Sequence, residues 1–271
     1  MIEVTGTLAH RGEHIGESSG VTSYEGLVAQ IDAAGSDPNV RGVALEIDTF
    51  GGEVAGVFDL ADMIRDLRAV KPVWAFVAEA ALSAGYAIAS QADRIIVPRT
   101  GEVGSIGVLT LHADYSQMLD DQGVAVTLIY AGSHKVDGNP YAALPEDVRA
   151  DIQGRVEETR DLFAETVAAG RGSRLSAVAA LATEAQVYRG KHAVAAGLAD
   201  EVSDLRKAFA GFVADINAPG GGLKPRAGQT AQTTGAQSMK KGDQKAPSAA
   251  GEVAAGQTDT ERRFGDGRFG R

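Results

Sequence analysis

Apolar residues in the first hundred positions follow two different periods. Short apolar runs bounded by turn residues predict buried strands at 41–49 ("RGVALEIDT"), 71–79 ("KPVWAFVAE") and 93–98 ("DRIIVP"). Between them, a helical period at 53–70 and a run of small residues at 83–92 predict helices. Strands that alternate with helices are typical of parallel βαβ units, so the pattern predicts the α/β fold class.

The pattern continues with two more apolar runs and a long helix. Strands are predicted at 105–113 ("SIGVLTLHA") and 124–132 ("VAVTLIYAG"), on either side of a short helix at 115–123. A longer helical pattern covers 144–172 and is opened by Pro145, a residue favoured at helix starts. Its apolar positions are Val148, Ile152, Val156, Phe163 and Val167.

The two ends of the chain differ in character. Residues 22–35 ("TSYEGLVAQIDAAG") predict a helix that opens with a capping box made by Thr22 and Glu25. From about residue 218, Gly, Ala, Gln, Thr, Ser and Pro dominate, and such a segment cannot bury enough apolar surface to offset its ordering entropy. The sequence therefore predicts a folded domain at 1–217 and a disordered, scaffold-like tail at 218–271.

Composition excludes several classes of protein. The 271 residues include no cysteine, which rules out disulfides and thiolate metal sites. The five histidines show no ligand spacing, and neither GxGxxG nor GxxxxGK[ST] occurs, so we expect no metal, nucleotide or other cofactor. No apolar run approaches the roughly 18 residues of a membrane span, and the start does not look like a secretory signal. A cytoplasmic protein is expected.

Charge is unevenly distributed along the chain. The net charge is −10, but nine basic and five acidic residues lie from Pro219 onward, so that part carries +4 and the preceding residues carry −14. An acidic body argues against nucleic acid as a partner.

Ser83 is the first candidate for chemistry. It begins a helix of small residues directly after a predicted strand. A serine in that position is usually a helix N-cap. The same geometry also suits a nucleophile, because the amide of Ala84 points the same way and Gly85 allows a substrate backbone to approach closely.

A pair of glycines, Gly51 and Gly52, follows the predicted strand at 41–49. Paired glycines between a strand and a helix can free backbone amides to face a ligand. They can equally form a tight strand-to-helix turn.

A serine nucleophile needs a base within hydrogen-bond reach, and two candidates lie in the loop "AGSHKVDGNPY". His134 would need a carboxylate to orient it, and Asp137 is near it in sequence. Lys135 can act as a base only when neutral, which burial away from carboxylates favours. The residues alone leave both candidates open, along with a solvated loop lysine.

Four motifs in order, "DTFGG", "ALSAGYAIAS", "TGEVGSIGV" and "AGSHKVDGNPY", resemble the signal peptide peptidase A family of serine–lysine peptidases. This family belongs to the Clp protease/crotonase superfamily, and within it the sequence is most similar to capsid-assembly proteases of tailed phages. The resemblance covers residues 4–206. It implies that Ser83 is the nucleophile, that Lys135 is the general base and that Ser105 orients the lysine amine.

The resemblance also implies an oxyanion hole. It would be made by the backbone amides of Gly51 or Gly52, together with Ala84. Phe50 departs from the family pattern, which usually has proline before the paired glycines. The shape of the turn, and which glycine amide faces the substrate, are therefore left open by the sequence.

The expected function is that of an endopeptidase in a phage head. The resemblance implies a homo-oligomer whose substrates are scaffold, portal or the protease itself, in the host cytoplasm or the immature head. A soluble bacterial peptidase that degrades membrane-derived peptides is the alternative. An acyl-CoA enzyme and a non-catalytic assembly scaffold are rivals from other classes. Small residues between Pro219 and Gly256 also predict that the enzyme trims its own tail.

Overall fold

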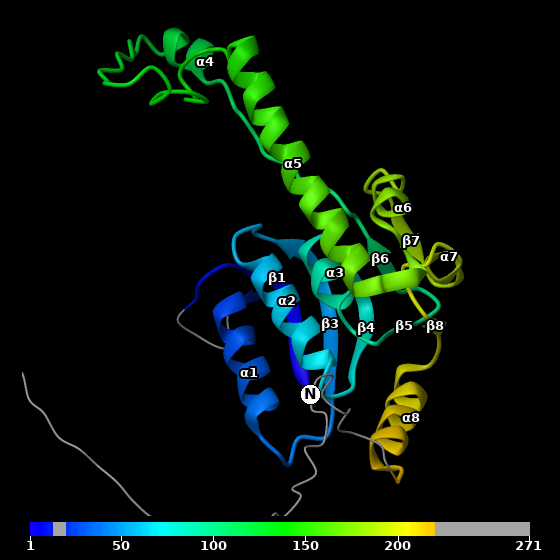
Figure 1. Ribbon diagram of the computed structural model, residues 1–271. Coiled ribbons are helices and arrows are strands. Elements are labelled where there is room, and N and C mark those ends of the chain that lie inside the picture. Colours follow the sequence, from blue (N-terminus) through cyan, green and yellow to red (C-terminus); the bar gives the residue numbers. More distant parts are fainter. Residues whose placement is uncertain (13–19, 220–271) are drawn as a thin grey trace, which may run out of the picture. The chain divides into compact units, whose positions relative to one another are not determined.

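The computed structural model describes residues 1–12 and 20–219, in which eight strands form one sheet (Figure 1). The strand order is β2-β1-β3-β4-β5-β8, with β6 pairing with β4 and β7 with β6. Only the β6–β7 pair is antiparallel among the described strands. The strands are β1 (Ile2–Ala9), β2 (Val21–Ser23), β3 (Val43–Gly52), β4 (Val73–Leu82), β5 (Arg94–Val97), β6 (Glu102–Gly104), β7 (Val187–Arg189) and β8 (Glu201–Val202).

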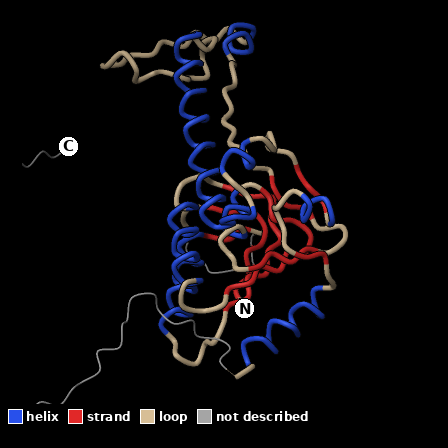
Figure 2. Tube along the Cα trace, turned by 45° about the vertical axis from the view of Figure 1, so that its right-hand side comes forward, coloured by secondary structure: helices blue, strands red, loops and turns tan. Residues whose placement is uncertain are grey.

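Helices lie on both faces of the sheet, with α1 and α2 on one side and α8 on the other (Figures 1 and 2). Alternate side chains of β4 pack on the two faces of the sheet, as expected for a central parallel strand. Val73 and Ala75 pack with the helices of the larger core, whereas Trp74 and Phe76 pack against Phe212 of α8. The helices are α1 (Tyr24–Ser36), α2 (Val57–Arg68), α3 (Ala84–Ala89), α4 (Ser116–Asp121), α5 (Glu146–Arg171), the 3-10 turn Gly172–Arg174, α6 (Ala177–Leu181), α7 (Lys191–Ala195) and α8 (Leu205–Asn217).

The sheet and its helices confirm the predicted α/β class. The strands predicted at 41–49, 71–79 and 93–98 correspond to β3, β4 and β5, and the long helix predicted at 144–172 is α5. In the described ranges, no helix combines the length and the apolar character needed to cross a membrane. Apart from residues 218 and 219, the predicted tail and the self-trimming expected within it lie outside the described residues.

The predicted capping box is wrong by one residue. The N-cap of α1 is Ser23, whose Oγ accepts a hydrogen bond from the amide of Gly26 at 3.1 Å. Thr22 belongs instead to β2, and its Oγ1 donates to the carbonyl of Thr5 in β1 at 2.7 Å. The pairing of β2 with β1 therefore uses the side chain that the sequence pattern placed at the cap.

Residues 109–145, which we call the arm, do not join the sheet. Although the structure describes both segments, it has no strand at 105–113 or 124–132, so these two predictions are wrong. Figure 1 shows α5 running past the sheet, with α4 of the arm beside its N-terminal end. An apolar alternation produces a strand only when a neighbouring strand offers hydrogen bonds, and no strand within residues 1–12 and 20–219 pairs with the arm. Its apolar side chains stay exposed, including Leu109, Leu111 and Ile129.

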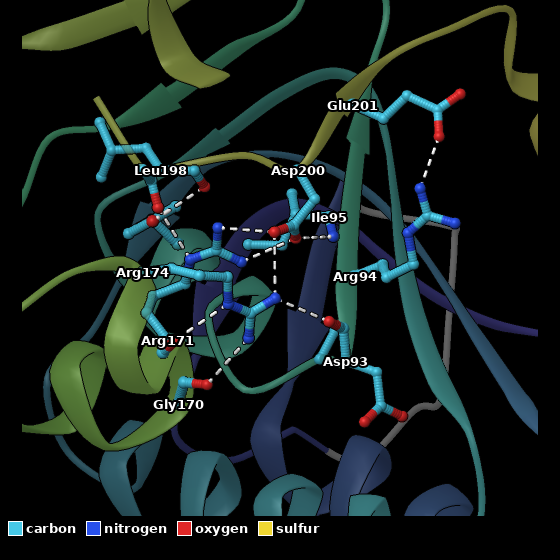
Figure 3. A network of polar contacts seen from close by, with 12 residues as sticks. Asp93, Arg94, Ile95, Gly170, Arg171, Arg174, Leu198, Asp200 and Glu201 are labelled. Atoms are coloured by element: carbon cyan, nitrogen blue, oxygen red, sulfur yellow. Dashed lines mark hydrogen bonds and ion pairs between the residues drawn. The ribbon is translucent and has the colours of Figure 1, made fainter. Parts of the chain in front are cut away.

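The C-terminal end of α5 is held to the sheet by a buried ion pair (Figure 3). The side chain of Arg171 is fully buried and donates to both carboxylate oxygens of Asp200, at 2.8 and 3.0 Å. Arg174 and the amide of Ile95 also donate to Asp200. Burial alone would raise the pKa of Asp200, but these donors, Arg171 foremost, hold that pKa below its usual value.

Arg171→Leu should lower the free energy of unfolding by about 3–5 kcal/mol, because it leaves Asp200 partly buried without its main partner. Denaturant titration of the full chain would measure the change. Arg155→Leu on the same helix is the matched control. Its ion pair with Asp151 is exposed, so its removal should change the free energy by no more than about 0.5 kcal/mol. Equal effects of the two substitutions would contradict this account.

Candidate active site

Ser83 lies at the junction where β4 ends and α3 begins, in a strained backbone conformation. Its φ of 51° and ψ of −124° belong to a region that residues other than glycine rarely adopt. The amide of Ser83 donates to the carbonyl of Gly104 at 3.0 Å, and its own carbonyl accepts from Tyr86 and Ala87. The serine is therefore fixed from both sides by β6 and by the first turn of α3.

The hydroxyl of Ser83 is not used as a helix cap. Ser83 occupies the N-cap position of α3, but its side chain makes no capping hydrogen bond. The ordinary structural reason for a serine at this position is therefore missing. The conformation is strained and the hydroxyl remains available, which is the combination expected at a functional site.

The glycine turn at the end of β3 passes directly over Ser83. The φ of Gly51 is +111°, and a Cβ added there would lie 2.7 Å from the Cβ of Ser83 and 3.2 Å from the amide nitrogen of Ala84. The amide of Gly51 donates to Oγ1 of Thr49 at 3.0 Å. Of the two candidate glycine amides, the one of Gly51 is therefore already engaged, and the one of Gly52 is the better candidate to face a substrate.

Ser105 lies close to this junction. It follows directly after Gly104, whose carbonyl receives the amide of Ser83. Its φ of 54° is again in the left-handed region, and its amide donates to the carbonyl of Gln186 at 3.0 Å. The two strained serines thus end two neighbouring paired strands, β4 and β6.

A small pocket opens beside Ser83. Its lining includes Gly52 and Ala84, the residues whose amides could bind an oxyanion. The rest of the wall is largely apolar, so the pocket suits a small uncharged side chain. Its apolar residues are Val54, Val57, Phe58, Ala87, Val108 and Phe163.

Lys135 is not part of this pocket. It lies in the arm, where its side chain is exposed. Its neighbour His134 is also exposed, and Nδ1 of that ring lies 2.8 Å from a carboxylate oxygen of Asp137. Both candidate bases are therefore in the arm, and within one chain the structure does not bring either of them to Ser83.

The length of α5 gives a measure of the distance between the loop of the candidate bases and Ser83. His134 and Asp137 border a groove with Asp151 of α5, whereas Phe163 of α5 borders the pocket of Ser83. Asp151 and Phe163 are twelve positions apart, and a rise of 1.5 Å per residue makes this about 18 Å along the helix.

Sequence reasoning did not single out Thr49, which contacts the glycine turn directly. A threonine hydroxyl that binds the backbone amide two residues later is a recognised turn motif, and this signal was present in "DTFGG". Across residues 1–12 and 20–219, no three His, Asp or Glu side chains gather as a metal ion would require.

Comparison with known proteins gives the family of the chain. The family model of peptidase family S49 matches residues 65–216. The chain therefore belongs to peptidase family S49, a family of serine peptidases, and the expected resemblance to the signal peptide peptidase A family is confirmed.

Two phage proteins are among its relatives. The chain is 50% identical over 202 residues to capsid assembly protease C of Escherichia phage lambda, covering 74% of this chain and 46% of that protein. It is 46% identical over 217 residues to head-tail preconnector protein GP5 of Enterobacteria phage P21, covering 80% of this chain and 43% of that protein. The chain spans less than half the length of these curated relatives.

Ser83→Gly should be more stable than Ser83→Ala by about 1 kcal/mol, since glycine adopts a positive φ without strain. Both variants lack the hydroxyl, so the comparison isolates the backbone. Denaturant midpoints of the two proteins would give the difference. Equal stability would show that the backbone at Ser83 is not strained.

Proposed function

We propose that this chain is a serine endopeptidase with a Ser–Lys dyad that acts in phage head assembly. The observation that carries the proposal is the strained Ser83, which makes no capping hydrogen bond and lines a small pocket beside a glycine turn. Family membership and the two phage relatives support it. No cofactor enters the reaction as proposed.

The chemistry would proceed by acyl transfer. Ser83 Oγ attacks the scissile carbonyl while the neutral amine of Lys135 takes its proton, and Ser105 orients that amine. The amides of Gly52 and Ala84 donate to the oxyanion that forms, and such donors are worth about 10²–10³ in kcat each. Lys135 then delivers the proton to the leaving amine, and water hydrolyses the acyl-enzyme.

We infer that Lys135 reaches Ser83 from a second copy of the chain. The support is the distance along α5 between the groove beside His134 and the pocket of Ser83. Docking of the arm on another copy would also take Lys135 out of water, and burial favours the neutral amine that a base requires.

The surface of the arm supports the same inference. Ile129 is 97% exposed, Leu109 88% and Leu111 86%, an unusual exposure for large apolar side chains. The alternation around them also predicts strands, which find no partner in the described part of the chain. A homo-oligomer in which arms pair with neighbouring copies would bury these side chains and satisfy the backbone.

The proposed substrates are protein segments with small residues at the cleaved bond. The pocket beside Ser83 is lined by apolar residues that include Phe58 and Phe163, which leaves little space. The printed names of the two phage relatives concern capsid assembly and the head-tail preconnector, so scaffold, portal and the protease itself are the candidates. The reaction would then take place in the immature head, within the host cytoplasm.

Ser83→Ala and Lys135→Ala should each abolish proteolysis, and an equal mixture of the two should recover it. In a symmetric oligomer with shared sites, roughly a quarter of the sites would combine an intact Ser83 with an intact Lys135. Cleavage of a fluorescent casein, after co-refolding of the variants, would measure the recovery.

Two controls separate the possible outcomes. Wild type should be labelled at Ser83 by a fluorophosphonate, and Ser83→Ala should not. Inactivity of wild type would overturn the proposed activity. Active wild type with an inactive mixture would show that the arm folds back on its own chain, and full activity of His134→Ala would exclude His134 as the base.

Ile129→Glu should convert the oligomer to smaller species, because a carboxylate in a docked apolar surface loses its hydration. Light scattering on the full chain would detect the change in mass. Val178→Glu is the matched control, since Val178 is a 77% exposed apolar residue of α6, outside the arm. A monomeric wild type, or dissociation by both substitutions alike, would contradict the role of the arm.

A further inference from the structure

Thr49 joins three parts of the candidate active site although its side chain is almost fully buried, at 1% exposure. Its Oγ1 donates to the carbonyl of Gly6 in β1 at 2.5 Å and accepts the amide of Gly51 at 3.0 Å. Its methyl group lies against α3, since a Cβ added at Gly85 would be 2.3 Å from Cγ2 of Thr49. One side chain therefore contacts β1, the glycine turn and the helix that follows Ser83.

The position of Thr49 coincides with irregularities in the sheet. The β1–β3 pairing shifts register between Thr5 and Thr7, and the β3–β4 pairing shifts between Ile47 and Thr49. The regular ladder is interrupted on both sides of β3, just before the turn that crosses Ser83. Where a ladder is interrupted, side chains must supply the missing hydrogen bonds.

We propose that Thr49 is a positioning residue for the oxyanion-binding amide of Gly52. By accepting the amide of Gly51, its hydroxyl fixes the rotation of the turn, and its bond to Gly6 fixes the hydroxyl itself. Gly52, the next residue, lines the pocket of Ser83. This assignment rests on the proposed peptidase function and concerns the same site.

The assignment predicts which step is affected. An oxyanion donor acts on the transition state more than on the bound substrate, so misplacing it lowers the rate of bond formation without weakening binding. Thr49→Val keeps the shape of the side chain and removes only the hydroxyl. It also leaves the amide of Gly51 without its acceptor.

The experiment uses a fluorophosphonate probe on the full chain, with mass spectrometry to confirm the adduct at Ser83. Reaction of Ser83 Oγ forms the oxygen–phosphorus bond and expels fluoride, and no natural substrate has to be known. For Thr49→Val we expect the maximal labelling rate to fall at least about tenfold, with the half-saturating probe concentration unchanged. Thr49→Ser, which keeps the hydroxyl, should label within about threefold of wild type.

Thr22→Val is the matched control. Its hydroxyl also donates to a carbonyl of β1, that of Thr5 at 2.7 Å, but it lies on β2 and not on the strand that carries the glycine turn. Its labelling should match wild type. If Thr49→Val does not fold, Thr49→Ala replaces it, since alanine and serine both lack the methyl group and only alanine lacks the hydroxyl.

The outcomes distinguish this assignment from the proposed function. A wild type that is not labelled overturns the proposed function and this assignment with it. A labelled wild type with an equally reactive Thr49→Val overturns the assignment alone. Equal losses in Thr49→Ser and Thr49→Val, or a loss in Thr22→Val as large, would assign the effect to packing and also overturn it.

Discussion

The geometry of the site depends on one close contact, between the turn that ends β3 and the serine that ends β4. Neighbouring parallel strands bring their carboxyl ends to the same edge of the sheet, so this turn and this serine must meet. Position 51 accepts only glycine without rearrangement, because the Cβ of any other residue would overlap Ser83. The placement of the pocket, of the Gly52 amide and of the first turn of α3 all follow from that crossing.

The body of the fold was predictable because its signals are local. The period of apolar residues identified β3, β4, β5 and α5, and the strand-to-helix junction identified Ser83 as a candidate. For Thr49, only the local half of the role, the bond to the Gly51 amide, has a signal in the sequence. The other half, the bond to the carbonyl of Gly6, joins residues 43 positions apart, and no local pattern reports it. The two arm strands were wrongly predicted for a related reason. The alternation of apolar residues is a property of one segment, whereas a strand also requires a second segment with which to pair.

α5 has two different halves, and this division explains how a single helix can serve both the body and the arm. Its C-terminal part is buried through Phe163 and Val167 and is held by the ion pair of Arg171. The earlier apolar positions, such as Ile152, are only partly covered within the chain. The anchored half therefore sets the direction in which the other half carries the arm.

The separation of Lys135 from Ser83 within one chain has a consequence for when the enzyme would work. Under the proposed shared site, a dilute chain holds the nucleophile and the base apart and is inactive as made. Activity would then rise faster than in proportion to protein concentration, because each site requires an encounter between copies. Confinement of many copies inside a shell would raise their local concentration and so activate the protease. No separate activating cleavage would be needed, because the dilute chain is already inactive.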